Sequence, residues 1–213
     1  MRIVTAQELE SWLADGVVLE SDGRGPKVAA LSNGLYLKIF HTRRAQWLAR
    51  LRPAAIRFAR NAQTLAFHHI ATPEITETFW LDHDKGLTGC LYRPLPGQSL
   101  ERLFHDSPEK LAAILPRLAG FIRELHANKI YFRSLHIGNI LILPSGEFGL
   151  IDFLDLQKKT FPLNAWQIRR NLRHMKNHLK RKKLENFPFE MLQALYYNKD
   201  VHALAQKSHR HKT

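Results

Sequence analysis

The sequence YFRSLHIGNIL at residues 131–141, followed by LIDF at residues 150–153, decides the predicted fold of this chain. Ile140–Leu143 is a short apolar run, and Phe148–Ile151 is another. The PSG sequence that separates them is typical of a tight turn. The two runs are therefore predicted to pair as the strands of a β-hairpin.

Two polar side chains flank this hairpin. Asn139 stands just before the first strand, and Asp152 stands just after the second. Because the start of one hairpin strand lies beside the end of the other, an amide oxygen and a carboxylate should meet at one end of a small sheet. Hard oxygen ligands of this kind suit Mg²⁺, which takes few protein ligands and leaves room for phosphate oxygens. The alternative is an ordinary buried hairpin with polar residues at its ends.

The same stretch resembles the catalytic loop and the metal-binding segment of protein-kinase-like phosphotransferases. In those proteins the loop begins with HRDL and ends on an Asn, and the second segment is DFG. The residues that stand in register with that pattern are Arg133, Leu135, Asn139, Asp152 and Phe153. The LHxGN form of the loop is the one found in small-molecule and lipopolysaccharide kinases.

Some positions depart from that pattern. Ser134 occupies the position of the catalytic Asp, Phe132 that of the loop His, and Leu154 that of the Gly after Asp-Phe. Serine is a poor base, since a neutral hydroxyl has no useful proton affinity at pH 7. His136 and Asp155 are the candidates for a substitute base, and the sequence places neither of them beside a substrate hydroxyl.

Residues 1–93 are predicted to form a β-rich lobe. Apolar runs at Val17–Leu19, Val28–Leu31 and Leu35–Phe40 predict strands, and an Asn-Gly turn joins the last two. Lys38 lies on the third of these strands, where a kinase-like lobe carries the lysine that pairs with nucleotide phosphates. The alternative is a lysine on the solvated face of a half-buried strand.

Helices are predicted at Ala45–Leu51 and Ala54–Phe67, separated by Pro53. In kinases the second helix carries the glutamate partner of the strand lysine, but this segment contains no glutamate. Gly23 and Gly25 in the first turn are weak evidence for a phosphate-binding loop, because they also suit a plain hairpin turn.

Further strands at Ile75–Leu81 and Leu87–Arg93 lead to residues 94–98, a predicted hinge. In the resemblance, Leu91 and Arg93 belong to the stretch whose backbone would contact an adenine ring. A plain linker is the alternative.

Past the hinge, Ser99 is predicted to cap a short helix, and Ser107-Pro108-Glu109 to open a long one. Apolar residues then recur at helical spacing as far as Leu125. A long amphipathic helix that feeds the catalytic loop matches the order of elements in the C-lobe of the kinase fold.

The chain has 213 residues and a formal net charge of +13, which favours polyanionic partners such as nucleic acid, anionic lipid head groups or phosphorylated glycans. No apolar run approaches the roughly 20 residues needed to span a bilayer, and residues 1–19 lack the apolar core of a secretory signal. The single cysteine, Cys90, excludes an intrachain disulfide and fits a reducing cytoplasm.

Residues 166–183 predict the most basic helix of the chain, rich in Lys and Arg and without an acid. Its apolar face is formed by Ile168, Leu172, Met175 and Leu179. The cationic face fits three interpretations, namely a solvated surface, a docking surface for membrane or anionic glycolipid, and a nucleic-acid contact. Residues 202–212 add further His, Lys and Arg side chains of unspecific spacing.

Taken together, these features resemble the lipopolysaccharide-core kinase (Kdo/WaaP) family of the protein-kinase-like superfamily. The resemblance implies an α+β, two-lobed protein-kinase-like fold. Its N-lobe, residues 1–93, holds an antiparallel sheet and helix 54–67, and residues 94–98 form the hinge. The trimmed, mainly helical C-lobe, residues 99–213, holds catalytic loop 131–141, metal segment 150–155 and basic helix 166–183.

The resemblance implies ATP- and Mg²⁺-dependent transfer of a phosphoryl group to a sugar hydroxyl of the lipopolysaccharide inner core, during biogenesis of the cell envelope. The implied partner is lipopolysaccharide core or another anionic glycolipid, and nucleic acid is not expected. The implied location is the cytoplasm, with peripheral contact to the inner membrane through residues 166–183.

Carried over residue by residue, Asn139 and Asp152 would hold Mg²⁺, and Lys38 would pair with the nucleotide phosphates. The rest of the nucleotide site would contain Gly23, Gly25, Leu91 and Arg93. The catalytic residues would be Ser134 in the degenerate base position, Arg133 as a brace of the loop, and His136. The alternative is a pseudokinase that keeps the fold without catalysis, because Ser134 replaces the catalytic Asp.

Overall fold

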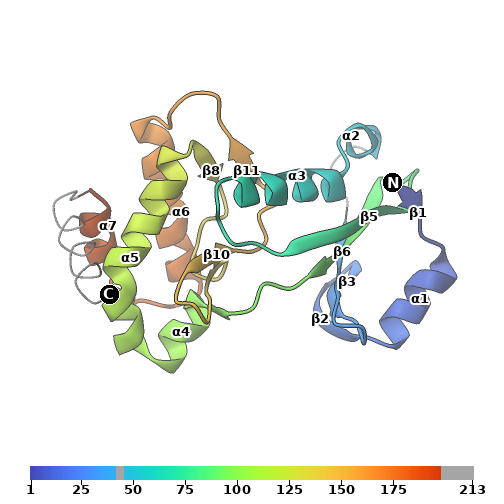
Figure 1. The fold of residues 1–213 in the computed structure, drawn as a ribbon, viewed down its shortest axis with the longest axis horizontal. Helices are drawn as coiled ribbons and strands as arrows, with labels where there is room; N and C mark the ends of the chain where they lie inside the picture. Colours follow the sequence, from blue (N-terminus) through green and yellow to red (C-terminus); the bar gives the residue numbers. More distant parts are fainter. Residues whose placement is uncertain (42–45, 198–213) are drawn as a thin grey trace. The chain divides into compact units, whose positions relative to one another are not determined.

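The computed structural model describes residues 1–41 and 46–197. The chain divides into two compact units, the first ending at Leu95 and the second beginning at Pro96 (Figure 1). Both units mix helices and strands, so the predicted α+β class is confirmed. The first residue of the predicted helix 45–51 and the basic segment 202–212 lie outside the described residues.

Unit 1 is built on a six-stranded sheet with the strand order β1-β5-β6-β4-β3-β2. Strand β1 pairs with β5 in parallel, and the other neighbours are antiparallel. The strands are β1 (Arg2–Ile3), β2 (Val17–Asp22), β3 (Gly25–Ala30), β4 (Tyr36–Phe40), β5 (Glu74–Asp82) and β6 (Leu87–Arg93). The helices are α1 (Ala6–Ala14), α2 (Gln46–Leu51) and α3 (Ala54–Phe67).

Strand alternation assigns α1 and α3 to opposite faces of this sheet. Leu37 of β4 belongs to a buried apolar cluster that packs against Trp12 of α1. Phe40, three residues further along the strand, faces the other way and contacts Phe58 of α3, with ring centroids 5.3 Å apart. Lys38 shares this second face with Phe40, so the lysine lies on the α3 side of the sheet.

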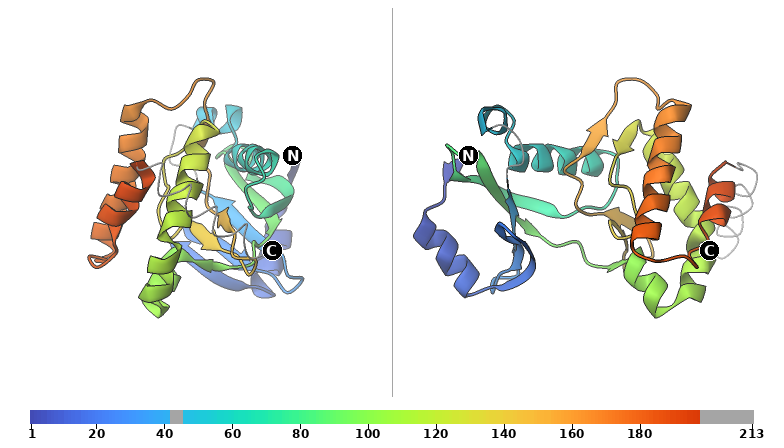
Figure 2. Two further views of the ribbon diagram at one scale, coloured as in Figure 1. Left: turned by 60° about the vertical axis from the view of Figure 1, so that its left-hand side comes forward. Right: turned by 180° about the vertical axis from the view of Figure 1, so that it is seen from behind.

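Unit 2 contains the predicted loop and hairpin. Its helices are α4 (Leu100–Asp106), α5 (Pro108–Ala127), α6 (Ala165–Arg181) and α7 (Phe189–Tyr197). Its strands are β7 (Gln98–Ser99), β8 (Ile130–Phe132), β9 (Ile140–Ile142), β10 (Phe148–Leu150) and β11 (Leu156–Lys158). They form a three-stranded sheet, β10-β9-β7, and a two-stranded sheet, β11-β8. Helix α7 packs against α5 (Figure 1, Figure 2).

The helices of unit 2 differ in how their N-termini are capped. The Ser99 side chain accepts a hydrogen bond from the Arg102 N–H, 3.2 Å, so the predicted cap of α4 is confirmed. Ser107-Pro108-Glu109 opens α5 as predicted, with Ser107 at the N-cap position, but the Ser107 side chain makes no capping hydrogen bond. Its backbone N–H instead donates to Leu103 at the end of α4, and this tight junction holds Ser107 in a different geometry. Helix α6 begins at a capping box formed by Asn164 and Gln167.

A glycine is required where the chain enters β7. Gly97 has a φ of +148°, and a Cβ atom there would meet the Ile142 carbonyl oxygen at 2.6 Å. Only a residue without a side chain lets the backbone pass β9 this closely. The glycine lies in the predicted hinge segment, and its conformation is now explained by this contact within unit 2.

Candidate functional site

The β9–β10 hairpin forms in the register that the sequence suggested. Ile140 pairs with Leu150 and Ile142 with Phe148. One step beyond this ladder, the Ile151 N–H donates to the Asn139 carbonyl, 3.0 Å. Asn139 and Asp152 are therefore held at the same end of the hairpin, by backbone hydrogen bonds that do not depend on either side chain.

The Asn139 side chain is buried, and its amide nitrogen donates to the Ser134 carbonyl oxygen, 3.1 Å. A carbonyl can only accept a hydrogen bond, so this contact fixes which end of the amide is which. The Oδ1 atom then faces away from Ser134. An oxygen ligand for a hard cation is thus oriented by the loop itself.

Asp152 has an unusual backbone, with a φ of +51°. Few residues other than glycine adopt this left-handed conformation, although Asp and Asn tolerate it best. Conformations of this kind cluster at functional sites, where the surrounding structure holds them in place. The Asp152 side chain is exposed, while its neighbour Phe153 is completely buried and anchors the segment.

The donor chemistry of this pair fits Mg²⁺, which is bound by one or two carboxylates together with substrate phosphates. Within residues 1–41 and 46–197, no group of three or more His, Cys, Asp or Glu side chains gathers as a metal site. The candidate magnesium site therefore consists of the Asn139 amide oxygen and the Asp152 carboxylate.

Ser134 is paired with the carboxylate of Asp155. Its hydroxyl donates to Asp155 Oδ2, 2.6 Å, and its N–H points at Asp155 Oδ1, 3.4 Å. The position that carries the catalytic Asp in kinases thus holds a carboxylate supplied from another segment. The Arg133 side chain beside it is exposed, and its predicted bracing role stays a prediction.

His136 is packed in a histidine stack rather than against Ser134. Its ring lies parallel to that of His178 of α6, with centroids 3.7 Å apart, and His178 Nε2 contacts Glu101 Oε2, 2.9 Å. Burial, and then the neighbouring histidines, lower the pKa of His136 to about 4. The imidazole is therefore neutral at pH 7.

A buried polar network anchors the start of the loop. The Asn171 amide of α6 donates to the Phe132 carbonyl oxygen, and its Oδ1 accepts from His126 Nε2, 3.1 Å. The Tyr196 hydroxyl of α7 lies 2.8 Å from His126 Nδ1 and donates to it. Burial lowers the pKa of His126, which keeps the ring neutral in this arrangement. Sequence reasoning missed this network, although Asn171 interrupts the apolar face of its helix, between Ile168 and Met175.

We expect Asn171→Ala to destabilise unit 2 by about 2–4 kcal/mol, because it leaves the buried Phe132 carbonyl without its donor and His126 Nε2 without its acceptor. The measurement is the free energy of unfolding in urea. Asn177→Ala, on an exposed position of the same helix, is the matched control and should change it by less than about 0.5 kcal/mol. Equal effects of the two substitutions would show that the network contributes nothing.

The exposed side of α6 carries a cationic pocket of about 530 Å³. The described residues that line it are Trp166, Arg169, Arg170, Arg173, His174 and Asn177. The Arg170 guanidinium lies over the Trp166 ring, 5.0 Å from its centroid. An aromatic face next to guanidinium groups suits a sugar that carries anionic groups. The predicted amphipathic helix is present, with Leu172, Met175 and Leu179 buried on its other face.

The predicted nucleotide-binding residues of unit 1 lie in strands β4 and β6 and at the turn between β2 and β3. The Lys38 ammonium lies 6.0 Å from the Phe40 ring centroid and 5.7 Å from that of Phe58. Gly23 and Gly25 flank the turn between β2 and β3, and Gly25 has a φ of +114°. The Leu91 side chain is buried in the apolar cluster, and its carbonyl accepts from Thr76 Oγ1, 3.1 Å. Arg93 forms an exposed ion pair with Glu74, 2.9 Å.

Comparison with known families assigns the second unit to a class of kinases. The model of the lipopolysaccharide kinase (Kdo/WaaP) family matches residues 95–206, which is more than half of the chain. The chain belongs to the lipopolysaccharide kinase (Kdo/WaaP) family, and the predicted family is confirmed. No curated protein matches the chain in sequence. None of the helices in the described ranges is long and apolar enough to cross a membrane.

Proposed function

We propose that this protein is an ATP- and Mg²⁺-dependent phosphotransferase that phosphorylates a sugar hydroxyl of the lipopolysaccharide inner core. Membership of the family indicates lipopolysaccharide kinase activity. The observation that carries the proposal further is the placement of Asn139 and Asp152 at one end of the β9–β10 hairpin. Phosphoryl transfer depends mostly on positioning and charge neutralisation, and this pair is suited to both.

In this proposal, Asn139 and Asp152 hold Mg²⁺, which neutralises charge on the phosphate oxygens when it is bound. Lys38 pairs with the nucleotide phosphates, and the β2–β3 turn with Gly23 and Gly25 lies along them. The backbone at Leu91 and Arg93 contacts the adenine ring. Arg133 braces the catalytic loop, and the neutral His136 helps to order it through its stack with His178.

The proposal treats the two units as the lobes of a protein-kinase-like fold. Residues 1–93 are the N-lobe, residues 94–98 the hinge and residues 99–213 the C-lobe. The unit boundary after Leu95 supports this division. The buried network at Asn171 supports it too, because it fixes the catalytic loop to the helices of its own unit.

The acceptor in this proposal lies with its anionic groups in the cationic pocket of α6. The enzyme works in the cytoplasm, and the same helix contacts the inner-membrane surface where the glycolipid is exposed. The density of guanidinium groups around Trp166 supports this assignment. Guanidinium groups bind carboxylate and phosphate oxygens in pairs, so the pocket should contribute to the affinity for the acceptor.

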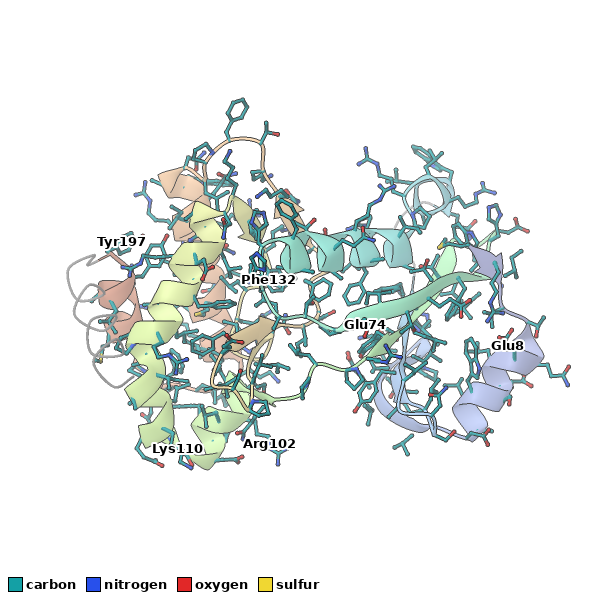
Figure 3. All side chains as sticks on the ribbon, viewed as in Figure 1. Glu8, Glu74, Arg102, Lys110, Phe132 and Tyr197 are labelled. Atoms are coloured by element: carbon teal, nitrogen blue, oxygen red, sulfur yellow. The ribbon has the colours of Figure 1, made fainter. Side chains whose placement is uncertain are left out.

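Replacement of Arg169, Arg170 and Arg173 by Gln should raise the KM for inner-core oligosaccharide by about 10-fold and change kcat less than about twofold, because the pocket binds without reacting. Steady-state kinetics measure both constants. The control removes the same charge at exposed positions, with Gln at Arg102, Lys110 and Lys180 (Figure 3 labels the first two). A similar KM increase in the control would show that the effect comes from the net charge of the protein and not from the pocket.

A pseudokinase is the second candidate, favoured by Ser134 in the base position. The test is transfer of labelled phosphate from ATP to dephosphorylated inner-core oligosaccharide, together with thermal stabilisation by ATP. Mg²⁺-dependent transfer establishes the kinase. Stabilisation by ATP without transfer would leave the pseudokinase, and the absence of both would refute a nucleotide site.

A further inference from the structure

The Ser134–Asp155 pair is built into the backbone pairing of unit 2. Strand β11 pairs with β8 so that Leu156 stands opposite Phe132, and both side chains are buried. Asp155 directly precedes this pair on one strand, and Ser134 follows it by two residues on the other. The antiparallel ladder therefore brings the residues together, and the 2.6 Å hydrogen bond completes the contact.

The pair also lies next to the candidate magnesium site. The Ser134 carbonyl accepts from the Asn139 amide, while the Ser134 hydroxyl donates to Asp155. One residue thus connects a metal ligand with a carboxylate. Asp155 is three residues beyond Asp152, and the buried Phe153 holds the segment between them.

The negative charge of Asp155 acts on one residue of the cationic pocket. His174, which lines the pocket, has its pKa lowered by burial and partly raised again by the negative charge of Asp155.

We propose that Asp155 is the catalytic base of this enzyme and that Ser134 is its positioning residue, an assignment that rests on the proposed phosphotransfer. The acceptor hydroxyl gives its proton to an Asp155 oxygen while its own oxygen forms a bond to the γ-phosphorus. The bond from that phosphorus to the β,γ-bridging oxygen breaks, and ADP leaves with the electron pair. The products are the sugar phosphate, ADP and a protonated Asp155, which returns its proton to water.

Asp155 has the capacity for this task. A carboxylate offers about four lone-pair sites, and Ser134 uses one with its hydroxyl and approaches a second with its N–H. The remaining sites can accept from a sugar hydroxyl. His136 is the weaker candidate, since its ring is stacked on His178 and its Nδ1 is buried without a partner among the described residues.

The test compares the parent with Asp155→Asn, Ser134→Ala and the exchange variant Ser134→Asp/Asp155→Ser. Loss of a general base costs about 10²- to 10⁴-fold in rate, so Asp155→Asn should lower kcat at least about 100-fold. The KM for ATP and the thermal stabilisation by ATP with Mg²⁺ should not change, since Asp155 holds neither metal nor nucleotide.

Ser134→Ala should lower kcat about 10-fold. The exchange variant should recover most of the lost rate, because it returns a carboxylate to position 134 with a serine opposite. Asp84→Asn, an exposed turn position, is the control.

The outcomes separate the two proposals. A parent that transfers phosphate while Asp155→Asn keeps kcat within about threefold overturns the base assignment and leaves the kinase intact. Loss of kcat together with loss of the melting transition or of ATP stabilisation, and without rescue by the exchange variant, assigns Asp155 a structural role and also overturns the proposal. A parent that binds no nucleotide and transfers no phosphate refutes the proposed function, and the base assignment with it.

Discussion

Replacing Asp152 by Asn should lower phosphate transfer by about 100- to 1,000-fold, the cost of removing one strong electrostatic contact at a reacting phosphate. Asn is the appropriate substitution because it keeps the size of the side chain and tolerates the left-handed backbone at this position, φ +51°. The change therefore removes charge from the metal ligand with little added strain. The measurement is kcat/KM for ATP at saturating Mg²⁺.

The control for this experiment is Asp84→Asn, which removes a charge from an exposed turn of unit 1 and should leave the rate unchanged. The melting temperature of Asp152→Asn should stay close to that of the parent, since the carboxylate is exposed. If transfer by Asp152→Asn stays within about threefold of the parent, Asp152 is not a ligand of a catalytic metal.

Lys38→Met should lower kcat/KM for ATP by about 100-fold, because the ammonium group is expected to neutralise charge on the nucleotide phosphates. Methionine keeps the apolar part of the side chain in contact with Phe40 and Phe58, so the sheet should still pack against α3. Loss of the cation–π contacts alone costs about 0.5–2 kcal/mol of stability and does not affect the nucleotide affinity. Steady-state kinetics with ATP as the varied substrate measure the effect.

Lys85→Met, an exposed position in the β5–β6 turn, is the matched control and should behave like the parent. Helix α3 carries no glutamate, so the kinase pattern of a lysine paired with a helix glutamate is not kept here. A Lys38→Met variant with unchanged KM and kcat would mean that this lysine only covers the aromatic face of the sheet.

The elements with strong local signals were predicted well. The helix Ala54–Phe67 has the predicted bounds, because Pro53 fixes its start and the apolar spacing its length. The hairpin β9–β10 followed from two apolar runs and one turn. The strands β8 and β11 were missed, since each has only three residues and their pairing joins segments that are distant in sequence. The short β7 was missed for the same reason.

The residues of the candidate site could be proposed from the sequence, but the contacts between them could not. The hairpin argument placed Asn139 and Asp152 together from sequence alone, because backbone pairing decides that placement. The choice between His136 and Asp155 depended on tertiary packing. Helix α6 stacks a histidine on His136, and the β8–β11 ladder brings Asp155 to Ser134. The sequence did not indicate the left-handed backbone of Asp152 either, since glycine is the residue that usually marks this conformation.

The most direct test of the shared metal site is a titration with Mn²⁺, which can replace Mg²⁺ at oxygen ligands and is followed by electron paramagnetic resonance. The titration is made with the full chain and a non-hydrolysable ATP analogue, on the parent, Asn139→Ala and Asp152→Asn. We predict a nucleotide-dependent Mn²⁺ site in the parent that each substitution weakens at least about 10-fold. Equal Mn²⁺ affinity in all three proteins would contradict the account, because Asn139 and Asp152 would then not converge on one cation.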